Sequence, residues 1–240
     1  MSWNTRAVRI LRRQLAMTPR QRSVVLGTLL GDAHLSVNAG GKNFRLQISQ
    51  GSAQKEYVLW KYEILRNFVL SPPAYYGKTD SWRFRTISHQ SFTALQHKFY
   101  QGRRKILPEN LVEILQDPLA LAVWFMDDGT RFPNGSLTIN TQSFTEDEQL
   151  LIVRVFRELY GWHVTLHRDH KRYRIYLGKD GSAQLKKLIM PYIIPIFQYK
   201  LNRPRRDSSH TIKGMIIDPR IEGIKTIITR RPPMNIGVKI

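Results

Sequence analysis

The residues best suited to chemistry are two aspartates, each at the end of an apolar segment. Asp32 ends the run SVVLGTLLGD, in a stretch with no further acidic residue before Glu56, and Asp128 ends LALAVWFMDD. A carboxylate at the C-terminal end of a helix costs about 0.3–1 kcal/mol, because it meets the negative end of the helix dipole. If the two helices pack side by side, a divalent cation between the aspartates would offset their repulsion. The sequence therefore predicts one metal site divided between two segments.

The expected metal ligands are all oxygen atoms. Asp32 and Asp128 would supply carboxylates, while Gly31 and Asp127 would supply main-chain carbonyls, or Asp127 only a nearby charge. Asp128 is taken as the ligand because it aligns with Asp32 when LLGDA is matched to FMDDG. Such donors suit Mg²⁺ or Mn²⁺, and the chain has no cysteine for a thiolate site.

Both aspartates belong to an internal repeat. Three polar pairs recur at the same offset to within one residue: Asp32 with Asp128, Gln47 with Gln142, and Lys105 with Lys200. Amphipathic segments recur as well, 57–70 with 150–160 and 91–99 with 182–190. Each polar residue alone would most often be structural or exposed, but the shared spacing predicts a duplicated half with a linker around 101–117.

The chain is strongly basic, with 38 Lys and Arg against 18 Asp and Glu and a net charge of +20. This bias favours a polyanionic partner, nucleic acid first and an anionic membrane surface second. No apolar stretch approaches the roughly 20 residues that span a bilayer, so no transmembrane helix is expected. The absence of cysteine fits a reducing compartment, with the host open between an organelle (mitochondrion or chloroplast) and a bacterial or archaeal cytoplasm.

Two helices should position the aspartates. Thr18 and Asp117 are each followed by Pro, which is the pattern of a side-chain cap with Pro at the first helical position. Gly27 and Gly31 lie four residues apart, on one face of the first helix. We expect that face to let the second helix approach closely.

Strand-like alternation appears at 44–49, 82–87, 136–143, 163–168 and 172–178. An apolar back and a polar front would suit a sheet that reads the major groove, although a single such face is also typical of an ordinary solvated sheet. Recurrence in both halves favours the first interpretation. The residues expected to contact DNA are Lys42, Arg45, Gln47, Ser49, Arg83, Arg85, Thr138, Asn140, Gln142, His167, Arg172 and Arg174.

A hard metal site in such a scaffold points to hydrolysis of phosphodiester bonds by metal-bound water. Lys105 and Lys200 would then stabilise charge on the phosphate or help to activate water. Gln47 and Gln142 would hold that water in line for attack.

The segments around the aspartates resemble a known motif. VLGTLLGDA (25–33) and LAVWFMDDG (121–129) are similar to the two copies of the nine-residue motif of the LAGLIDADG homing endonucleases. Further segments resemble the intron-encoded branch of that family, namely VLSPP (69–73), ILPENLVE (106–113), NTQSF (140–144) and YKL (199–201). The likeness covers about residues 18–202.

The resemblance implies an α+β fold of two pseudo-twofold-related αββαββα halves. The motif helices would pack at the centre, and two antiparallel saddle-shaped sheets would bind DNA. The expected division is a basic N-terminal helix at 1–17, halves at 18–105 and 106–202, and a basic C-terminal tail at 203–240. The Arg-rich N-terminus is also compatible with a transit peptide.

The resemblance further implies a monomeric, site-specific DNA endonuclease. It would cut both strands across the minor groove of a long pseudo-palindromic or asymmetric site, leaving 3′ overhangs, with two or three Mg²⁺ ions or Mn²⁺ as a substitute. Asp32 and Asp128 match the metal-binding aspartates, and Lys105 and Lys200 match the basic residues of the active site.

The glutamines and the activity leave alternatives open. Gln47 and Gln142 lie where the family often places water-pocket or base-reading groups, and Gln50 is an alternative in the first half. The rival functions are an RNA maturase that assists intron splicing and a catalytically inactive DNA-binding protein of the same fold.

Overall fold

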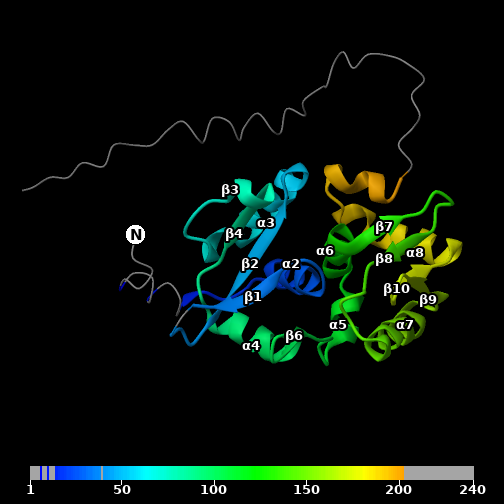
Figure 1. Ribbon diagram of the computed structural model, residues 1–240, viewed down its shortest axis with the longest axis horizontal. Helices are drawn as coiled ribbons and strands as arrows, with labels where there is room; N and C mark the ends of the chain where they lie inside the picture. Colours follow the sequence, from blue (N-terminus) through cyan, green and yellow to red (C-terminus); the bar gives the residue numbers. More distant parts are fainter. Residues whose placement is uncertain (1–5, 7–9, 11–13, 39, 203–240) are drawn as a thin grey trace, which may run out of the picture. The chain divides into compact units, whose positions relative to one another are not determined.

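A computed structural model of the protein describes residues 6, 10, 14–38 and 40–202. The expected C-terminal tail at 203–240 and most of the expected N-terminal helix at 1–17 lie outside the described residues. Figure 1 shows the arrangement of the helices and strands.

The first half begins with a capped helix and continues through one four-stranded antiparallel sheet. Thr18 caps α2, and its capping box with Gln21 explains why the helix starts at Pro19. The elements in chain order are α2 (Pro19–Leu30), β1 (His34–Val37), β2 (Phe44–Gly51), α3 (Lys55–Leu65), β3 (Ala74–Tyr76), β4 (Ser81–Arg85) and α4 (Gln90–Phe99). The strand order in the sheet is β1-β2-β4-β3.

The second half repeats this order of elements. They are α6 (Pro118–Asp128), β7 (Gly129–Arg131), β8 (Leu137–Ile139), α7 (Glu146–Tyr160), β9 (Val164–Asp169), β10 (Arg172–Leu177) and α8 (Lys179–Ile189). Their sheet has the corresponding order β7-β8-β10-β9, again antiparallel. The two αββαββα halves confirm the expected fold and the internal repeat.

The segment between the halves is more ordered than a linker. It contains the short hairpin β5 (Tyr100–Gln101) and β6 (Arg104–Lys105), followed by α5 (Leu111–Gln116), which packs against α6 and α7. Short 3-10 helices complete the described chain at Ser52–Gln54, Arg66–Phe68, Gly77–Thr79, Met190–Tyr192 and Pro195–Lys200.

One predicted strand was too long. Of the segment 136–143, only Leu137–Ile139 is β-strand. β8 ends at Ile139, and two residues later the Thr141 hydroxyl donates to Gln149 Oε1 of α7 at 3.1 Å. Alternation did not locate β1, β3 and β7 within the expected αββαββα halves, since strands of three or four residues are too short to show it.

The two halves meet where α2 packs against α6, and Figure 1 shows these helices side by side between the two sheets. A Cβ atom on Gly27 would lie 2.3 Å from the Ala120 carbonyl oxygen and 2.8 Å from Val123 Cβ. The expected close approach of the helices is therefore confirmed. We refer to the contact between α2 and α6 as the helix seam.

Replacing Gly27 by Ala should destabilise the protein by about 1–3 kcal/mol, because the added methyl group would collide with the backbone of the opposing helix. Urea unfolding would measure the loss. The matched control is Gly51→Ala, since no atom lies within 4 Å of the position of its Cβ. Equal stability of the two variants would contradict the seam as described.

Candidate active site

The seam brings the two predicted aspartates together. Asp32 follows α2 and is exposed, whereas Asp128 is the last residue of α6 and is half-buried. The indole nitrogen of Trp124 donates to Asp128 Oδ2 at 3.1 Å. Burial, followed by the charges of Asp127 and Asp32, raises the pKa of Asp128 to about 8, although Lys105 opposes the shift. Three carboxylates therefore share one electrostatic environment.

Each predicted lysine reaches the end of one motif helix. Lys105 Nζ donates to the Gly31 carbonyl at 2.7 Å, and Lys200 Nζ donates to the carbonyls of Met126 at 2.6 Å and Asp127 at 3.3 Å. Burial lowers the pKa of both lysines, while the neighbouring aspartates act in the opposite direction. The repeat thus places one ammonium group beside the carbonyl preceding each of the two aspartates, Asp32 and Asp128.

The first-half glutamine next to Asp32 is Gln50, the alternative left open by the sequence. Its Nε2 donates to Asp32 Oδ2 at 3.0 Å. Gln47 is three positions earlier in β2, so it points to the opposite face of the sheet, where its amide donates to the Ser36 hydroxyl. The register of β2 therefore separates Gln47 from the aspartates.

Gln142 does not occupy the position expected of it. It lies beyond the end of β8, and its Nε2 donates to Asp169 Oδ2 at 2.6 Å, near the turn between β9 and β10. Its backbone carbonyl accepts from Arg172 at 2.8 Å. Because β8 ends early, Gln142 is neither in a strand nor bonded to Asp128, and its predicted water-holding role is not supported.

Asp127 takes part in a buried network that the sequence analysis missed. Its Oδ1 accepts from Lys61 Nζ at 2.8 Å and its Oδ2 from the Thr28 hydroxyl at 2.8 Å, and the side chains of Lys61 and Asp127 are both 0% exposed. One signal was available. Lys61 falls four residues from Tyr57 and from Leu65, on the buried stripe of α3, where an unpaired charge would be costly.

The donors at the seam fit a divalent metal ion. Among the described residues, no three His, Cys, Asp or Glu side chains are grouped as a complete metal site. The available donors are the Asp32 and Asp128 carboxylates and the carbonyls of Gly31 and Asp127, with water and phosphate to fill a coordination shell. Burial first, and then the charges of Asp127 and Asp32, raise the pKa of Asp128, and a bound cation would favour its charged form.

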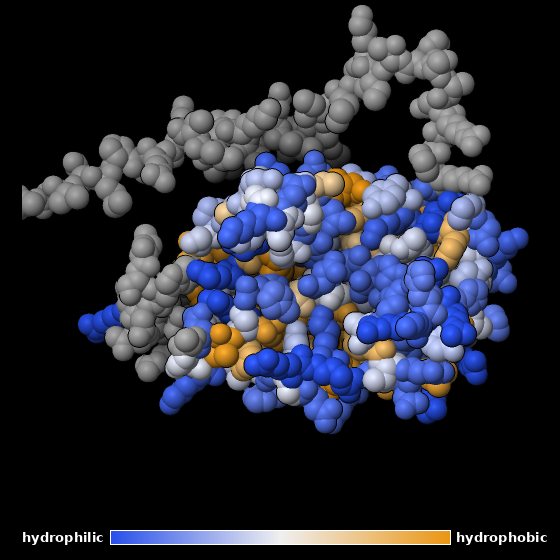
Figure 2. Space-filling model, in the orientation of Figure 1, coloured by the Kyte–Doolittle hydropathy of each residue, from blue (hydrophilic) through white to orange (hydrophobic). Residues whose placement is uncertain are grey.

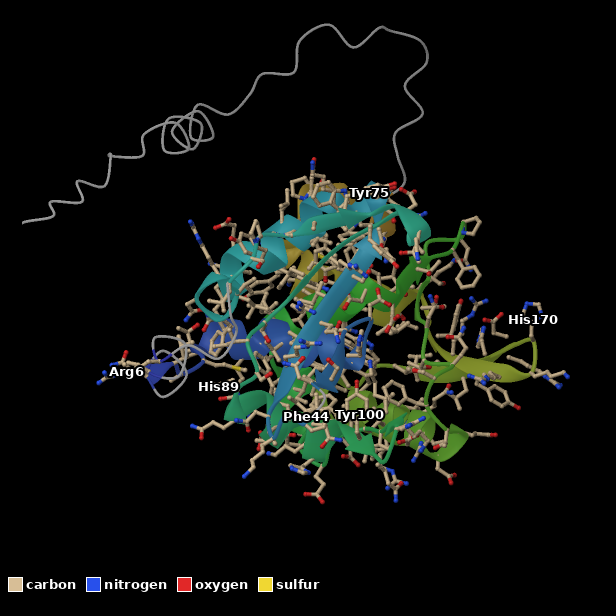
Figure 3. The ribbon with its side chains drawn as sticks, turned by 60° about the vertical axis from the view of Figure 1, so that its left-hand side comes forward. Arg6, Phe44, Tyr75, His89, Tyr100 and His170 are labelled. Carbon is tan, nitrogen blue, oxygen red and sulfur yellow. The ribbon has the colours of Figure 1, made fainter. Side chains whose placement is uncertain are left out.

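The front face of the first sheet carries cations in register. Gln47 pairs with Arg85 and Ser49 with Arg83 across β2 and β4, while Arg45 lies farther along β2. Burial, and then the charge of Arg85, lower the pKa of Arg45. Lys42 precedes β2 in the connecting loop. Figure 3 shows β2 in the foreground, with Phe44 at one end and Tyr75 of β3, which pairs with β4, near the other.

The second sheet has a more mixed front face. His167 and Arg174 are cross-strand partners in β9 and β10, and Arg172 follows the turn that carries the outward-pointing His170 (Figure 3). Hydrophilic residues gather on this part of the surface in Figure 2, where Figure 1 places β9 and β10. The exposed end of this sheet therefore presents several groups able to contact a polyanion.

Two predicted contacts of the second sheet lie near β8. Thr138 is 0% exposed, and its hydroxyl donates to the Thr130 carbonyl at 3.4 Å, so its predicted contact with DNA is not supported. Asn140 follows β8, and its side-chain amide donates to the Thr130 hydroxyl at 3.3 Å near the surface.

Comparisons with known proteins agree with this geometry. A model described as the LAGLIDADG DNA endonuclease family matches residues 22–185. Probable intron-encoded endonuclease 1 of Wickerhamomyces canadensis is 28% identical over 194 residues, which cover 75% of this chain and 83% of that protein. Cytochrome b mRNA maturase bI2 of Debaryomyces hansenii is 30% identical over 190 residues, which cover 74% of this chain and 72% of the relative.

A solved structure is also similar. The homing endonuclease I-WcaI bound to its DNA recognition sequence is 25% identical and has a TM-score of 0.78, with 84% of this chain and 95% of that chain covered.

Within the described residues, none of the helices has the length and apolar character needed to cross a membrane.

The metal-free protein should lose stability as the pH rises from about 5 to 8. With its pKa near 8, folded Asp128 keeps a proton that the unfolded chain releases near pH 4, so the folded state binds more protons in this window. Asp128→Asn removes this contribution. In the presence of a chelator, the melting temperature of wild type should therefore fall relative to that of Asp128→Asn as the pH increases.

The control for this titration is Asp147→Asn, an exposed position in the first turn of α7. Its stability should run parallel to that of wild type across the same pH range. A constant difference between wild type and Asp128→Asn would refute the raised pKa.

Proposed function

The chain belongs to the LAGLIDADG DNA endonuclease family, and on this premise we propose that it acts as a monomer that cuts both strands of a specific DNA site. The observation that carries the proposal is the pair of aspartates at the seam, each next to a carbonyl held by its own lysine. An inactive DNA-binding protein would have no need of this clustered, mutually repelling set of carboxylates. Residues 18–105 and 106–202 would each bind one half of the site.

The sheets would bind DNA along their polar front faces. Arg45, Arg83 and Arg85 supply cations for phosphates or guanine edges in one half, and Arg172 and Arg174 supply them in the other. Sheets of opposite halves on either side of the seam would centre the duplex over the two aspartates. Specificity would arise from both half-sites, which need not be symmetric because the two faces differ.

The chemistry would be phosphodiester hydrolysis. Asp32 and Asp128, with the carbonyls of Gly31 and Asp127, would hold the divalent ions, Mg²⁺ or Mn²⁺, two or three in number. Bound at this place, the metal supplies charge neutralisation and an activated water. Gln50, whose Nε2 donates to Asp32, would orient the attacking water in the first half.

The two lysines, Lys105 and Lys200, would donate protons or neutralise negative charge during cleavage. Because burial lowers the pKa values of Lys105 and Lys200, each is a better proton donor than a lysine in water. Each ammonium group, held at the end of a motif helix, would stabilise the negative charge that develops on the phosphate.

A second candidate function is assistance of RNA splicing, favoured by the 30% identity to the Debaryomyces hansenii maturase. RNA binding would use the basic surface without the paired carboxylates. A splicing assay on a precursor RNA, run beside DNA cleavage with the same preparation, distinguishes the two. Splicing that survives Asp32→Asn would place the two activities in separate sites.

Asp32→Asn and Asp128→Asn should each reduce DNA cleavage at least about 100-fold and leave DNA binding intact, because an amide keeps the shape of the carboxylate but not its charge for a metal ion. Cleavage sites would first be selected from a randomised DNA library in Mg²⁺, with chelator as the blank. Binding would be measured by gel shift on the selected site. Glu109→Gln, an exposed substitution, is the control, and full cleavage by either aspartate variant would refute the assignment.

Arg83→Ala should weaken DNA binding and, where the contact is to a phosphate, reduce the slope of log affinity against log salt concentration by about 0.9. Arg83 is exposed and lies over the Tyr76 ring at 3.6 Å, so it is preset on the front face. Arg66→Ala, which removes an exposed arginine paired with Glu63, is the matched control. An unchanged affinity and salt slope for Arg83→Ala would show that the first sheet binds DNA elsewhere.

A further inference from the structure

The side chain of Asp127 crosses the helix seam. It belongs to the second half, yet its hydrogen-bond partners among the described residues all belong to the first: Thr28, Asp32 N, Gln50 and Lys61. Gly31 provides the space, since a Cβ at that position would lie 2.6 Å from Asp127 Cβ. Asp127 is thus enclosed by the half to which it does not belong.

Lys61 anchors this carboxylate from α3. Its Nζ donates to Asp127 Oδ1 at 2.8 Å and to the Thr28 hydroxyl at 2.7 Å, and it lies 3.9 Å from the centroid of the Tyr57 ring. With 0% exposure, neither charge of the pair has water as a substitute partner. A buried pair with this geometry strongly restricts the position of both side chains.

A chain of hydrogen bonds leads from Lys61 to Asp32. Gln50 Nε2 lies 3.4 Å from Asp127 Oδ1 and 3.0 Å from Asp32 Oδ2, so the amide is shared between the two carboxylates. Lys61 fixes Asp127, Asp127 limits the rotation of the Gln50 amide, and Gln50 orients the Asp32 carboxylate.

Among the described residues of the second half, no equivalent chain of hydrogen bonds leads to Asp128. Lys61 is the seventh residue after the cap of α3, and the seventh residue after the cap of α7 is Ile152, which is 0% exposed. Asp128 instead accepts a hydrogen bond from Trp124 of its own helix. The two aspartates are therefore held by different means.

We propose that Lys61 is a positioning residue for Asp32 and that, acting through Asp127 and Gln50, it sets the rate at which one strand is cut without equally affecting the other. This proposal rests on the proposed endonuclease function. A small displacement of a reacting group can cost orders of magnitude in rate, so a loosened Asp32 should slow its own cleavage step. The product should then be nicked DNA.

The test variant must not leave one charge of the buried Lys61–Asp127 pair without its partner. Lys61→Met alone leaves a buried carboxylate without its partner, and we expect it to fold poorly. Lys61→Met combined with Asp127→Asn removes both charges and keeps an amide that can still accept from Gln50. The matched control is Lys55→Met, the same substitution at an exposed position of the same helix.

Nicking would be followed on a supercoiled plasmid carrying the selected site, and the cleavage rate of each DNA strand on a linear duplex end-labelled on one strand at a time. In the double variant the ratio of the two strand-cleavage rates should change at least about 10-fold, and nicked plasmid should accumulate. Gln50→Ala should slow cleavage of the same DNA strand. Lys55→Met should keep the wild-type ratio. The proposal would be overturned if the double variant slowed cleavage of both DNA strands equally. It would also be overturned if the double variant and Gln50→Ala slowed cleavage of opposite DNA strands.

A second measurement uses metal-free protein and no DNA. The side-chain amide protons of Gln50, which is 8% exposed, should exchange with water at least about 10-fold faster in the double variant than in wild type or Lys55→Met. Unchanged exchange would overturn the role of Lys61. If wild-type protein cuts no DNA from the library, the endonuclease function fails, whereas the exchange experiment still reports on the network.

Discussion

The close approach of α2 and α6 is the constraint on which the rest of the structure depends. Gly27 allows the backbones to meet, and this contact joins two hydrophobic cores into one while bringing two helix ends to a single point. Both helices are capped at their starts, by Thr18 and Asp117, so each begins at a defined residue and delivers its last turn to a defined place. The mutual repulsion of the carboxylates follows from the packing that places them there.

The sheets and the candidate site are positioned by the same elements. In each half the chain passes directly from the end of the motif helix into the edge strand of the sheet, β1 after α2 and β7 after α6. The polar front of each sheet is therefore held at a fixed distance from an aspartate by only a few residues. Because these connections are short, the sheet surface that contacts DNA and the aspartates of the candidate site belong to one rigid unit.

Much of this arrangement could be predicted from the sequence, because it depends on local signals. Capping residues with Pro marked the motif helices, alternation marked the longer strands, and the recurrence of Asp and Lys marked the repeat. The predictions were weaker where register decided the outcome. Gln47 and Gln50 differ by three positions in one strand, and only the pairing of β2 determines which of them faces Asp32. The roles predicted for Gln142 and Thr138 are not supported, because β8 is shorter than its alternating pattern. Lys61 was missed because its partner lies in the other half.

The side chain of Asp127 fills the space left by the missing side chain of Gly31, and this fit determines which halves can pack against each other. Two copies of the first half would leave an empty hollow at this point of the contact, and two copies of the second would press two side chains against each other. A knob on one half and a hole on the other are compatible only in an unlike pair. Each half is therefore expected to associate with its counterpart better than with a second copy of itself.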